Sequence, residues 1–205
     1  MKTALFVTHT KKQCGVYQWG KQIYEALSSS AKYKFVKAEC DSLPELLQSI
    51  ETNRPDVIIY NYHPAVMPWV CTRRAKGIYR NNIAGIHMLQ IEIIHEVTQQ
   101  VADTATAYRN TWVLGRMHKK LNSLFDFYIA PDPTLLLQNP LVFKTGRLVP
   151  EYTGTALPPK VFTVGSFGFA MAKKGFERII QKVQEEFDEA IIRFNMPSAD
   201  FGDKN

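Results

Sequence analysis

Three histidines follow or end hydrophobic runs of the sequence, where an imidazole could contact a ligand. His9 follows the run at residues 3–8, His63 lies just beyond the run at 56–61, and His95 ends the run at 89–95. A neutral imidazole carries one hydrogen-bond donor and one acceptor, so it can bind sugar hydroxyls or phosphate oxygens. If these runs are parallel strands, their carboxyl ends border the ligand crevice of the sheet. We therefore expect a binding role for all three histidines.

Two polar neighbours of these histidines are further candidates. Asn61 precedes His63 by two residues, and Glu96 directly follows His95. An amide and a carboxylate at the same strand ends would add polar groups for a ligand. The alternatives are structural: Pro64 sets a turn that fixes His63, and His95 caps a following helix.

Glycines follow the first run in the stretch "GVYQWGKQ", residues 15–22. Gly15, Gly20 and Lys21 have the spacing of a phosphate-binding P-loop, but Gln22 replaces the Ser or Thr that such a loop needs for Mg²⁺. Apolar residues at helical spacing predict that Gly20 lies inside a helix and that Lys21 points to solvent. The dinucleotide pattern GxGxxG is absent as well. What remains is Gly15 at a helix start, which is either an anion site or a plain turn.

A second basic helix start lies near the C-terminus, at Lys174 and Gly175. A lysine and free N–H groups at a helix N-terminus suit a diphosphate. Lys173 is an alternative, and the simplest other interpretation is an ordinary basic turn.

The elements that must position these residues alternate along the chain. Strands are expected at residues 3–8, 34–40, 56–61, 89–95, 127–130, 141–148, 161–166 and 190–195, and helices at 16–28, 44–52, 66–78, 104–124 and 174–186. Such alternation predicts an α/β fold with a Rossmann-like parallel sheet. Continuous apolar runs such as "DVIIYN" suit strands that are buried on both faces.

A Pro-, Gly- and Thr-rich segment at residues 150–160 divides this pattern in two. We predict a Rossmann-like domain at 1–149, a linker at 150–160 and the start of a second, incomplete domain at 161–205. The latter contains a single β-α-β unit, which cannot bury both faces of its sheet. It therefore belongs to an incomplete domain or joins another surface.

The net charge and cysteine content of the chain indicate which kinds of partner and compartment to expect. The formal net charge is +6, with 45% hydrophobic and 21% charged residues. A basic chain favours anionic partners, but the dispersed charges and the lack of a recognised motif argue against nucleic acid. Three cysteines without CxxC spacing favour a reducing compartment over a disulfide framework or zinc site. We therefore expect a cytoplasmic protein, with basic clusters that suit peripheral contact with an anionic membrane.

Taken in order, several stretches resemble GT-B glycosyltransferases, especially the large family-4-like retaining group. The first strand with its "GV" helix, "RPDVIIYNYHP", "IEIIHE" and "VGSFGFAMAKKGFERIIQKVQEEFDEAIIRF" are similar to successive parts of that fold. The resemblance covers essentially the whole chain. It implies a GT-B N-terminal domain followed by the beginning of the donor domain.

The resemblance also implies an activity: transfer of a sugar from a nucleotide-diphosphate-sugar to an acceptor hydroxyl on a glycan or lipid-linked molecule. Gly15, Lys174 and Gly175 would contact the donor phosphate; His9, Asn61, His63 and Glu96 would lie on the acceptor side; His95 would be catalytic. No cofactor or bound metal is implied, because the nucleotide-sugar is a substrate.

The sequence departs from that group in its second half. The arginine upstream of the "KG" lysine is not evident, and the paired glutamates that hold the nucleotide sugar would fall beyond Asn205. The alternative is therefore a non-catalytic module that binds a glycan or nucleotide, or one subunit of a split enzyme. A second subunit or a further C-terminal domain would then complete the donor site.

Overall fold

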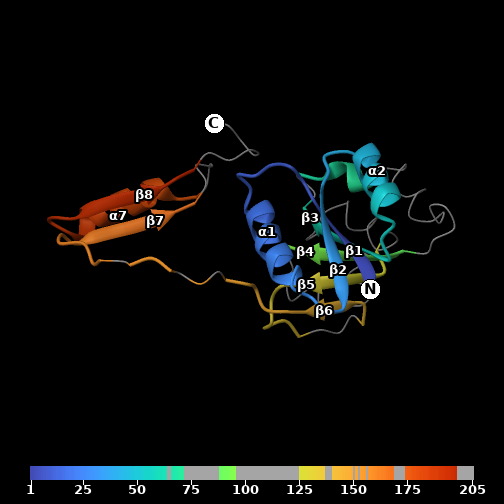
Figure 1. Ribbon diagram of the computed structural model, residues 1–205. Coiled ribbons are helices and arrows are strands. Elements are labelled where there is room, and N and C mark those ends of the chain that lie inside the picture. Colours follow the sequence, from blue (N-terminus) through green and yellow to red (C-terminus); the bar gives the residue numbers. More distant parts are fainter. Residues whose placement is uncertain are drawn as a thin grey trace. The chain divides into compact units, whose positions relative to one another are not determined.

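The computed structural model describes residues 1–63, 66–71, 88–95, 125–136, 140–149, 151, 153–155, 157–168 and 174–197. The chain forms two compact units (Figure 1). Unit 1 comprises Met1–Lys11 and Gly15–Val149, and unit 2 comprises Lys12–Cys14 and Pro150–Asn205.

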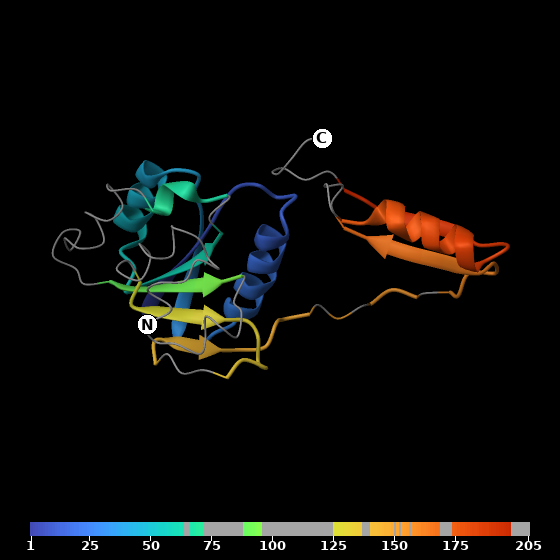
Figure 2. The ribbon, with the colours of Figure 1, turned by 180° about the vertical axis from the view of Figure 1, so that it is seen from behind.

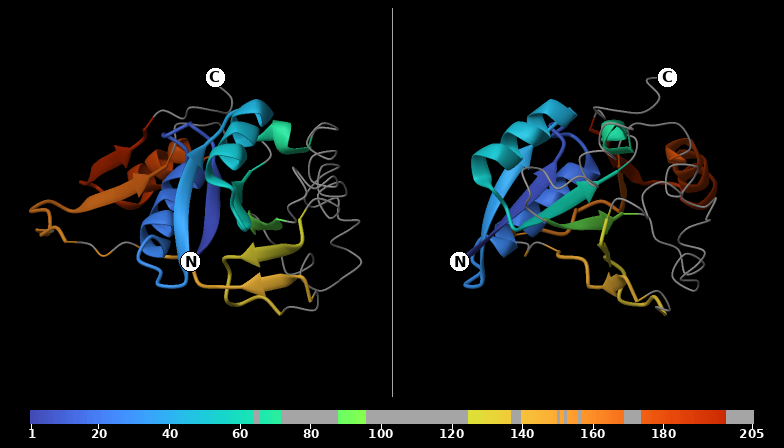
Figure 3. Two further views of the ribbon diagram at one scale, coloured as in Figure 1. Left: turned by 45° about the vertical axis from the view of Figure 1, so that its right-hand side comes forward. Right: turned by 90° about the vertical axis from the view of Figure 1, so that its right-hand side faces the viewer.

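Unit 1 is built on a six-stranded sheet in which every pair of neighbouring strands is parallel. Its strands are β1 (Lys2–Thr8), β2 (Tyr33–Glu39), β3 (Val57–Tyr62), β4 (Leu89–Ile94), β5 (Phe127–Ala130) and β6 (Val142–Lys144), in the order β2-β1-β3-β4-β5-β6. Figure 2 shows the common direction of β4, β5 and β6, and Figure 3 shows β2 and β6 at opposite edges. This Rossmann-like order confirms the predicted α/β class.

Two helices connect the first three strands. Helix α1 (Gly15–Leu27) follows β1 and packs through Trp19 on the sheet face that bears Phe6. Helix α2 (Leu43–Asn53) follows β2, and its residues Leu46 and Ile50 are buried. Right-handed crossovers in opposite directions along the sheet place these two helices on opposite faces.

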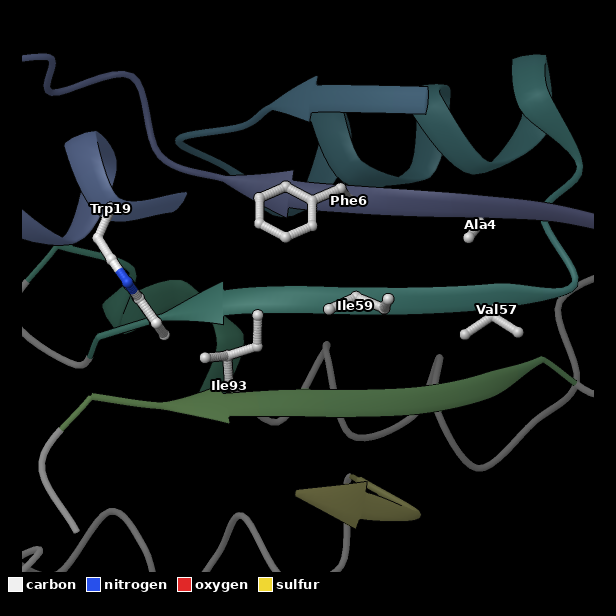
Figure 4. Packing of buried hydrophobic residues seen from close by; sticks show 6 residues of the cluster. All are labelled: Ala4, Phe6, Trp19, Val57, Ile59 and Ile93. Carbon is white, nitrogen blue, oxygen red and sulfur yellow. The ribbon is translucent and has the colours of Figure 1, made fainter. Parts of the chain in front are cut away.

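The core beneath α1 is made of side chains at every second strand position, because alternate residues of a strand share one face. Figure 4 shows this cluster of six buried residues: Ala4, Phe6, Trp19, Val57, Ile59 and Ile93. Full burial of a Val, Ile or Phe side chain contributes about 1.5–3 kcal/mol. The cluster therefore fixes α1 firmly on β1, β3 and β4.

Unit 2 contains the predicted β-α-β arrangement. Parallel strands β7 (Thr163–Phe167) and β8 (Ile191–Asn195) are joined by α7 (Phe176–Glu186). Ring contacts of Phe176 with Phe194, at 5.2 Å between centroids, hold the helix on the sheet.

Two expected elements differ from the structure, and one cannot be compared. The strand expected at 141–148 is short, because β6 pairs only with β5, which itself ends at Ala130. Of the helix expected at 66–78, the described part contains the 3-10 helix η1 (Pro68–Cys71). The helix expected at 104–124 lies outside the described residues.

A membrane-spanning helix would need about 20 predominantly apolar residues. Within the part of the chain that the structure describes, no helix is long and apolar enough to cross a membrane.

Candidate functional site

The strand order makes the chain leave the carboxyl ends of β1 and β3 in opposite directions. The connection from β1 runs to β2 at one side, and the chain after β3 continues to β4 at the other side. Such a reversal of direction separates the two loops and is where open α/β sheets bind ligands. His9 directly follows β1, His63 follows β3 and His95 follows β4. All three predicted histidines therefore lie at the same edge of the sheet.

These histidines are close enough to affect one another electrostatically. A positive charge on His63 lowers the pKa of both His9 and His95, and a charge on His9 also lowers the pKa of His95. Mutual repulsion of this kind decays within about a Debye length of 8–10 Å in salt solution. The sheet edge thus brings the three rings into one cluster.

His9 is fully buried, and its hydrogen bonding defines which ring nitrogen carries the proton. Its Nδ1 accepts a hydrogen bond from the backbone N–H of Lys11 at 3.1 Å. Burial lowers the pKa of His9 to about 4, so the ring is neutral at pH 7. A neutral ring that accepts at Nδ1 must carry its hydrogen on Nε2. This Nε2–H is buried, and no acceptor meets it among the described residues.

Neighbouring side chains fix the loop and helix around His9. The Thr10 N–H donates to Asp41 Oδ1 at 3.1 Å, and the Thr10 hydroxyl donates to Asp41 Oδ2. The Tyr17 ring lies 5.8 Å from His9, and its hydroxyl donates to Glu39 Oε1 at 2.5 Å. These bonds tie the segment after β1 to β2 and to its following loop.

His95 is held between a polar and an aromatic neighbour. Its Nε2 lies 2.8 Å from Asn61 Oδ1. Its ring meets Trp19 edge-on, with 4.8 Å between centroids and 83° between ring planes. Burial, with smaller contributions from nearby His63 and Arg147, lowers the pKa of His95 to about 3. His95 is therefore neutral at pH 7 and acts as a hydrogen-bonding group rather than as a cation.

Asn61 differs from the expectation that it offers its amide to a sugar. The side chain is fully buried on β3. Its Nδ2 donates to Thr8 Oγ1 at 3.0 Å and to the Val16 carbonyl at 2.9 Å, while Oδ1 faces His95. Both polar atoms of the Asn61 amide are engaged within the protein, so Asn61 holds neighbouring residues in place and offers no group to a ligand.

The glycine-containing stretch is a helix start and not a P-loop. Gly15 is the exposed first residue of α1, and a Cβ added there would meet no atom within 4 Å. Gly20 lies within α1, as predicted, and the exposed Lys21 pairs with Glu25 at 3.7 Å. The side-chain face of Gly15 is therefore open, whereas Lys21 is engaged with Glu25.

Arg147 is a site residue that sequence reasoning missed. Its exposed guanidinium lies 5.4 Å from the Trp19 ring centroid and acts electrostatically on His95. It follows the end of β6 by three residues. All six strands are parallel, so a basic residue just beyond the last strand lies at the same edge as the histidines. The place of Arg147 just after an expected strand is the feature of the sequence from which its role could have been predicted.

Two predicted residues belong to unit 2. Gly175 precedes α7 as its N-cap with φ of 75°, and Lys174 lies beside it. Both line a groove of about 530 Å³ together with Arg178 and Lys182. Basic side chains and a helix N-terminus favour an anion here. Of the other predicted site residues, His63 is half-buried at the end of β3, and Glu96 lies outside the described residues.

No group of three or more His, Cys, Asp or Glu side chains is arranged to hold a metal ion among the residues described. Comparison with models of known protein families gave no match, and comparison with curated proteins gave none.

Proposed function

We propose that this chain is a nucleotide-sugar-dependent glycosyltransferase, or the portion of one that binds the acceptor. It would transfer a sugar from a nucleotide-diphosphate-sugar to a hydroxyl of a glycan or lipid-linked acceptor. The observation that carries the proposal is the cluster of His9, His63, His95 and Arg147 at the ligand-binding edge of a Rossmann-like sheet.

The chemistry of this cluster suits a phosphorylated sugar. Neutral imidazoles such as His9 and His95 exchange hydrogen bonds with hydroxyl groups without the cost of desolvating a charge. Arg147 and the N-terminus of α1 at Gly15 supply positive potential for phosphate oxygens. One site thus offers partners for both halves of a sugar phosphate.

In the proposed reaction, the bond between the sugar and the nucleotide diphosphate breaks as the acceptor hydroxyl attacks the sugar. Negative charge develops on the departing diphosphate, and oriented donors and cations stabilise it in the transition state. In unit 1 we assign this role to Arg147 and to the N–H groups at the start of α1. Lys174 and Gly175 of unit 2 stay separately predicted phosphate contacts. His95 would hold a sugar hydroxyl close to the reacting carbon.

The test is a panel of nucleotide-sugars measured by thermal shift and by transfer of radiolabelled sugar to glycan and lipid-linked acceptors. We expect at least one donor to raise the melting temperature, since a ligand that binds only the folded state stabilises it. Arg147→Gln is expected to weaken binding about tenfold or more, while Arg193→Gln, on exposed β8, is the matched control. Equal effects of the two substitutions would contradict the assigned site.

The second candidate is a binding module without transferase activity. The described part of unit 2 holds two strands and one helix, which offer few groups for a nucleotide and its sugar. A thermal shift without transfer to any acceptor, alone or with added candidate subunits, would favour this function. A protein that binds no nucleotide-sugar and no glycan would contradict both candidates.

A further inference from the structure

A buried hydrogen-bond network joins four segments of unit 1. Asn61 on β3 is at its centre, Thr8 ends β1, the Val16 carbonyl belongs to the first turn of α1, and His95 follows β4. The three contacts span 2.8–3.0 Å between heavy atoms. Buried polar groups need partners, so this network constrains each of its members.

The Val16 carbonyl determines which way the Asn61 amide points. A backbone carbonyl only accepts hydrogen bonds, so the atom 2.9 Å from it must be the amide nitrogen. The same nitrogen reaches Thr8 Oγ1, which accepts its second hydrogen. The amide oxygen is therefore the atom that faces His95.

The amide oxygen in turn determines the tautomer of His95. An amide oxygen also only accepts, so His95 Nε2, 2.8 Å away, must carry a hydrogen and donate it. In the neutral ring Nδ1 then has a free lone pair. The edge-on contact with Trp19 opposes rotation of the ring out of this arrangement.

We propose that Asn61 is a positioning residue that fixes His95 as the Nε2–H tautomer, so that His95 meets a ligand only through Nδ1, as a hydrogen-bond acceptor. The group it recognises must then be a donor, such as a hydroxyl, and not the diphosphate of a nucleotide-sugar, whose ionised oxygens only accept hydrogen bonds at neutral pH. His9 is constrained at the opposite ring nitrogen, because its Nδ1 accepts from the Lys11 N–H and its hydrogen is therefore on the buried Nε2. The inference rests on the proposed function only in taking this sheet edge as the ligand site.

The tautomer can be measured directly on the full chain without any ligand. Long-range proton–nitrogen correlation spectra of ¹⁵N-labelled protein distinguish protonated from unprotonated imidazole nitrogens, and His95→Gln identifies the His95 signals. We expect a neutral His95 at pH 7 with the hydrogen on Nε2. A hydrogen on Nδ1, or an imidazolium at pH 7, would overturn the proposal. Because no substrate is present, this result is independent of whether the chain transfers sugars.

Two substitutions test the part played by Asn61. Asn61→Ala is expected to give His95 a mixture of tautomers, while His9, fixed by the Lys11 N–H, keeps its own. Asn61→Asp places a carboxylate beside Nε2 and is expected to raise the pKa of His95 by about 1–3 pH units. Asn53→Ala, which removes a similar amide-to-carbonyl bond on α2, is the matched control.

A single unchanged His95 tautomer in Asn61→Ala, or an unchanged His95 titration in Asn61→Asp, would show that Asn61 does not position the ring. If either variant fails to fold, the spectrum of the unsubstituted chain still decides the tautomer. Far-UV circular dichroism of each variant establishes that the fold is retained.

Discussion

The substitution Gly20→Ala adds one methyl group where α1 packs closely against β3, and its effect on stability tests that packing. A Cβ added to Gly20 would lie 2.1 Å from Asn61 Nδ2 and 2.6 Å from Asn61 Cγ. Real Cβ atoms do not approach other atoms this closely, so Asn61 would have to move. Its movement disturbs hydrogen bonds to Thr8, Val16 and His95.

Opposing contributions give the magnitude of the effect of Gly20→Ala. Replacing Gly by Ala inside a helix favours folding by about 1 kcal/mol. Leaving a buried polar group without its partner costs about 1–3 kcal/mol, and up to three hydrogen bonds are affected here. With two of these bonds lost, a cost of about 2–6 kcal/mol less the gain of about 1 kcal/mol gives an expected net loss of about 1–5 kcal/mol in the free energy of unfolding. Replacing a helical glycine that has free space around it by alanine would instead raise the free energy of unfolding.

The assay is urea unfolding followed by far-UV circular dichroism, with the free energy extrapolated to water. Gly15→Ala is the matched control, because a Cβ at Gly15 meets no atom within 4 Å and should change stability by no more than about 1 kcal/mol. In an Asn61→Ala background, Gly20→Ala should cost less, since the obstructing amide is gone. A Gly20→Ala protein as stable as the unsubstituted chain would refute this account of the packing.

Three further predictions concern titration and backbone strain. Because His9 and His95 are neutral when folded but bind protons below pH 6.5 when unfolded, the free energy of unfolding should fall as pH drops from 6.5 toward 4 and 3. For His95 the full difference corresponds to about 5 kcal/mol, so His95→Gln should flatten the pH dependence in denaturant titrations. Burial raises the pKa of Glu92, so the folded state loses stability as pH rises above the pKa that Glu92 has in the unfolded chain. The Glu92→Gln protein should therefore be about 1–3 kcal/mol more stable than the unsubstituted chain at pH 8, as measured by urea unfolding. Gly175 has φ of 75° and an added Cβ would lie 2.8 Å from Arg178, so Gly175→Ala should speed amide hydrogen exchange in α7 at least tenfold.

The fold was predictable because its signals are local and repeated. The run at 127–130 coincides with β5, and α1 and α2 begin within one residue of their expected starts. The short β6 was not predictable from its own apolar residues, since its length depends on how much of β5 is available for pairing. Strand order also depends on long-range pairing that no local pattern encodes.

The site was predictable only to the level of which strand ends carry histidine. The alternation of strands and helices places His9, His63 and His95 at one edge, but it gives no hydrogen-bond partners. The inward role of Asn61 arises from the close approach of α1 at Gly20, which is a tertiary contact. Glu92 was overlooked because an acid within "IEIIHE" is usually solvent-exposed, whereas its position on β4 is fully buried.

Arg147 lies over the Trp19 ring, and the His95 ring packs against the same indole in a T-shaped contact. The fluorescence of Trp19 should therefore be sensitive to both neighbours. The sequence has only three tryptophans, so the emission of Trp19 can be isolated by comparison with Trp19→Phe. Any molecule that draws Arg147 away from the ring, or alters His95, will change the fluorescence intensity. If the proposed function holds, Trp19 fluorescence would follow ligand binding at the carboxyl ends of β1, β3 and β4 without a label.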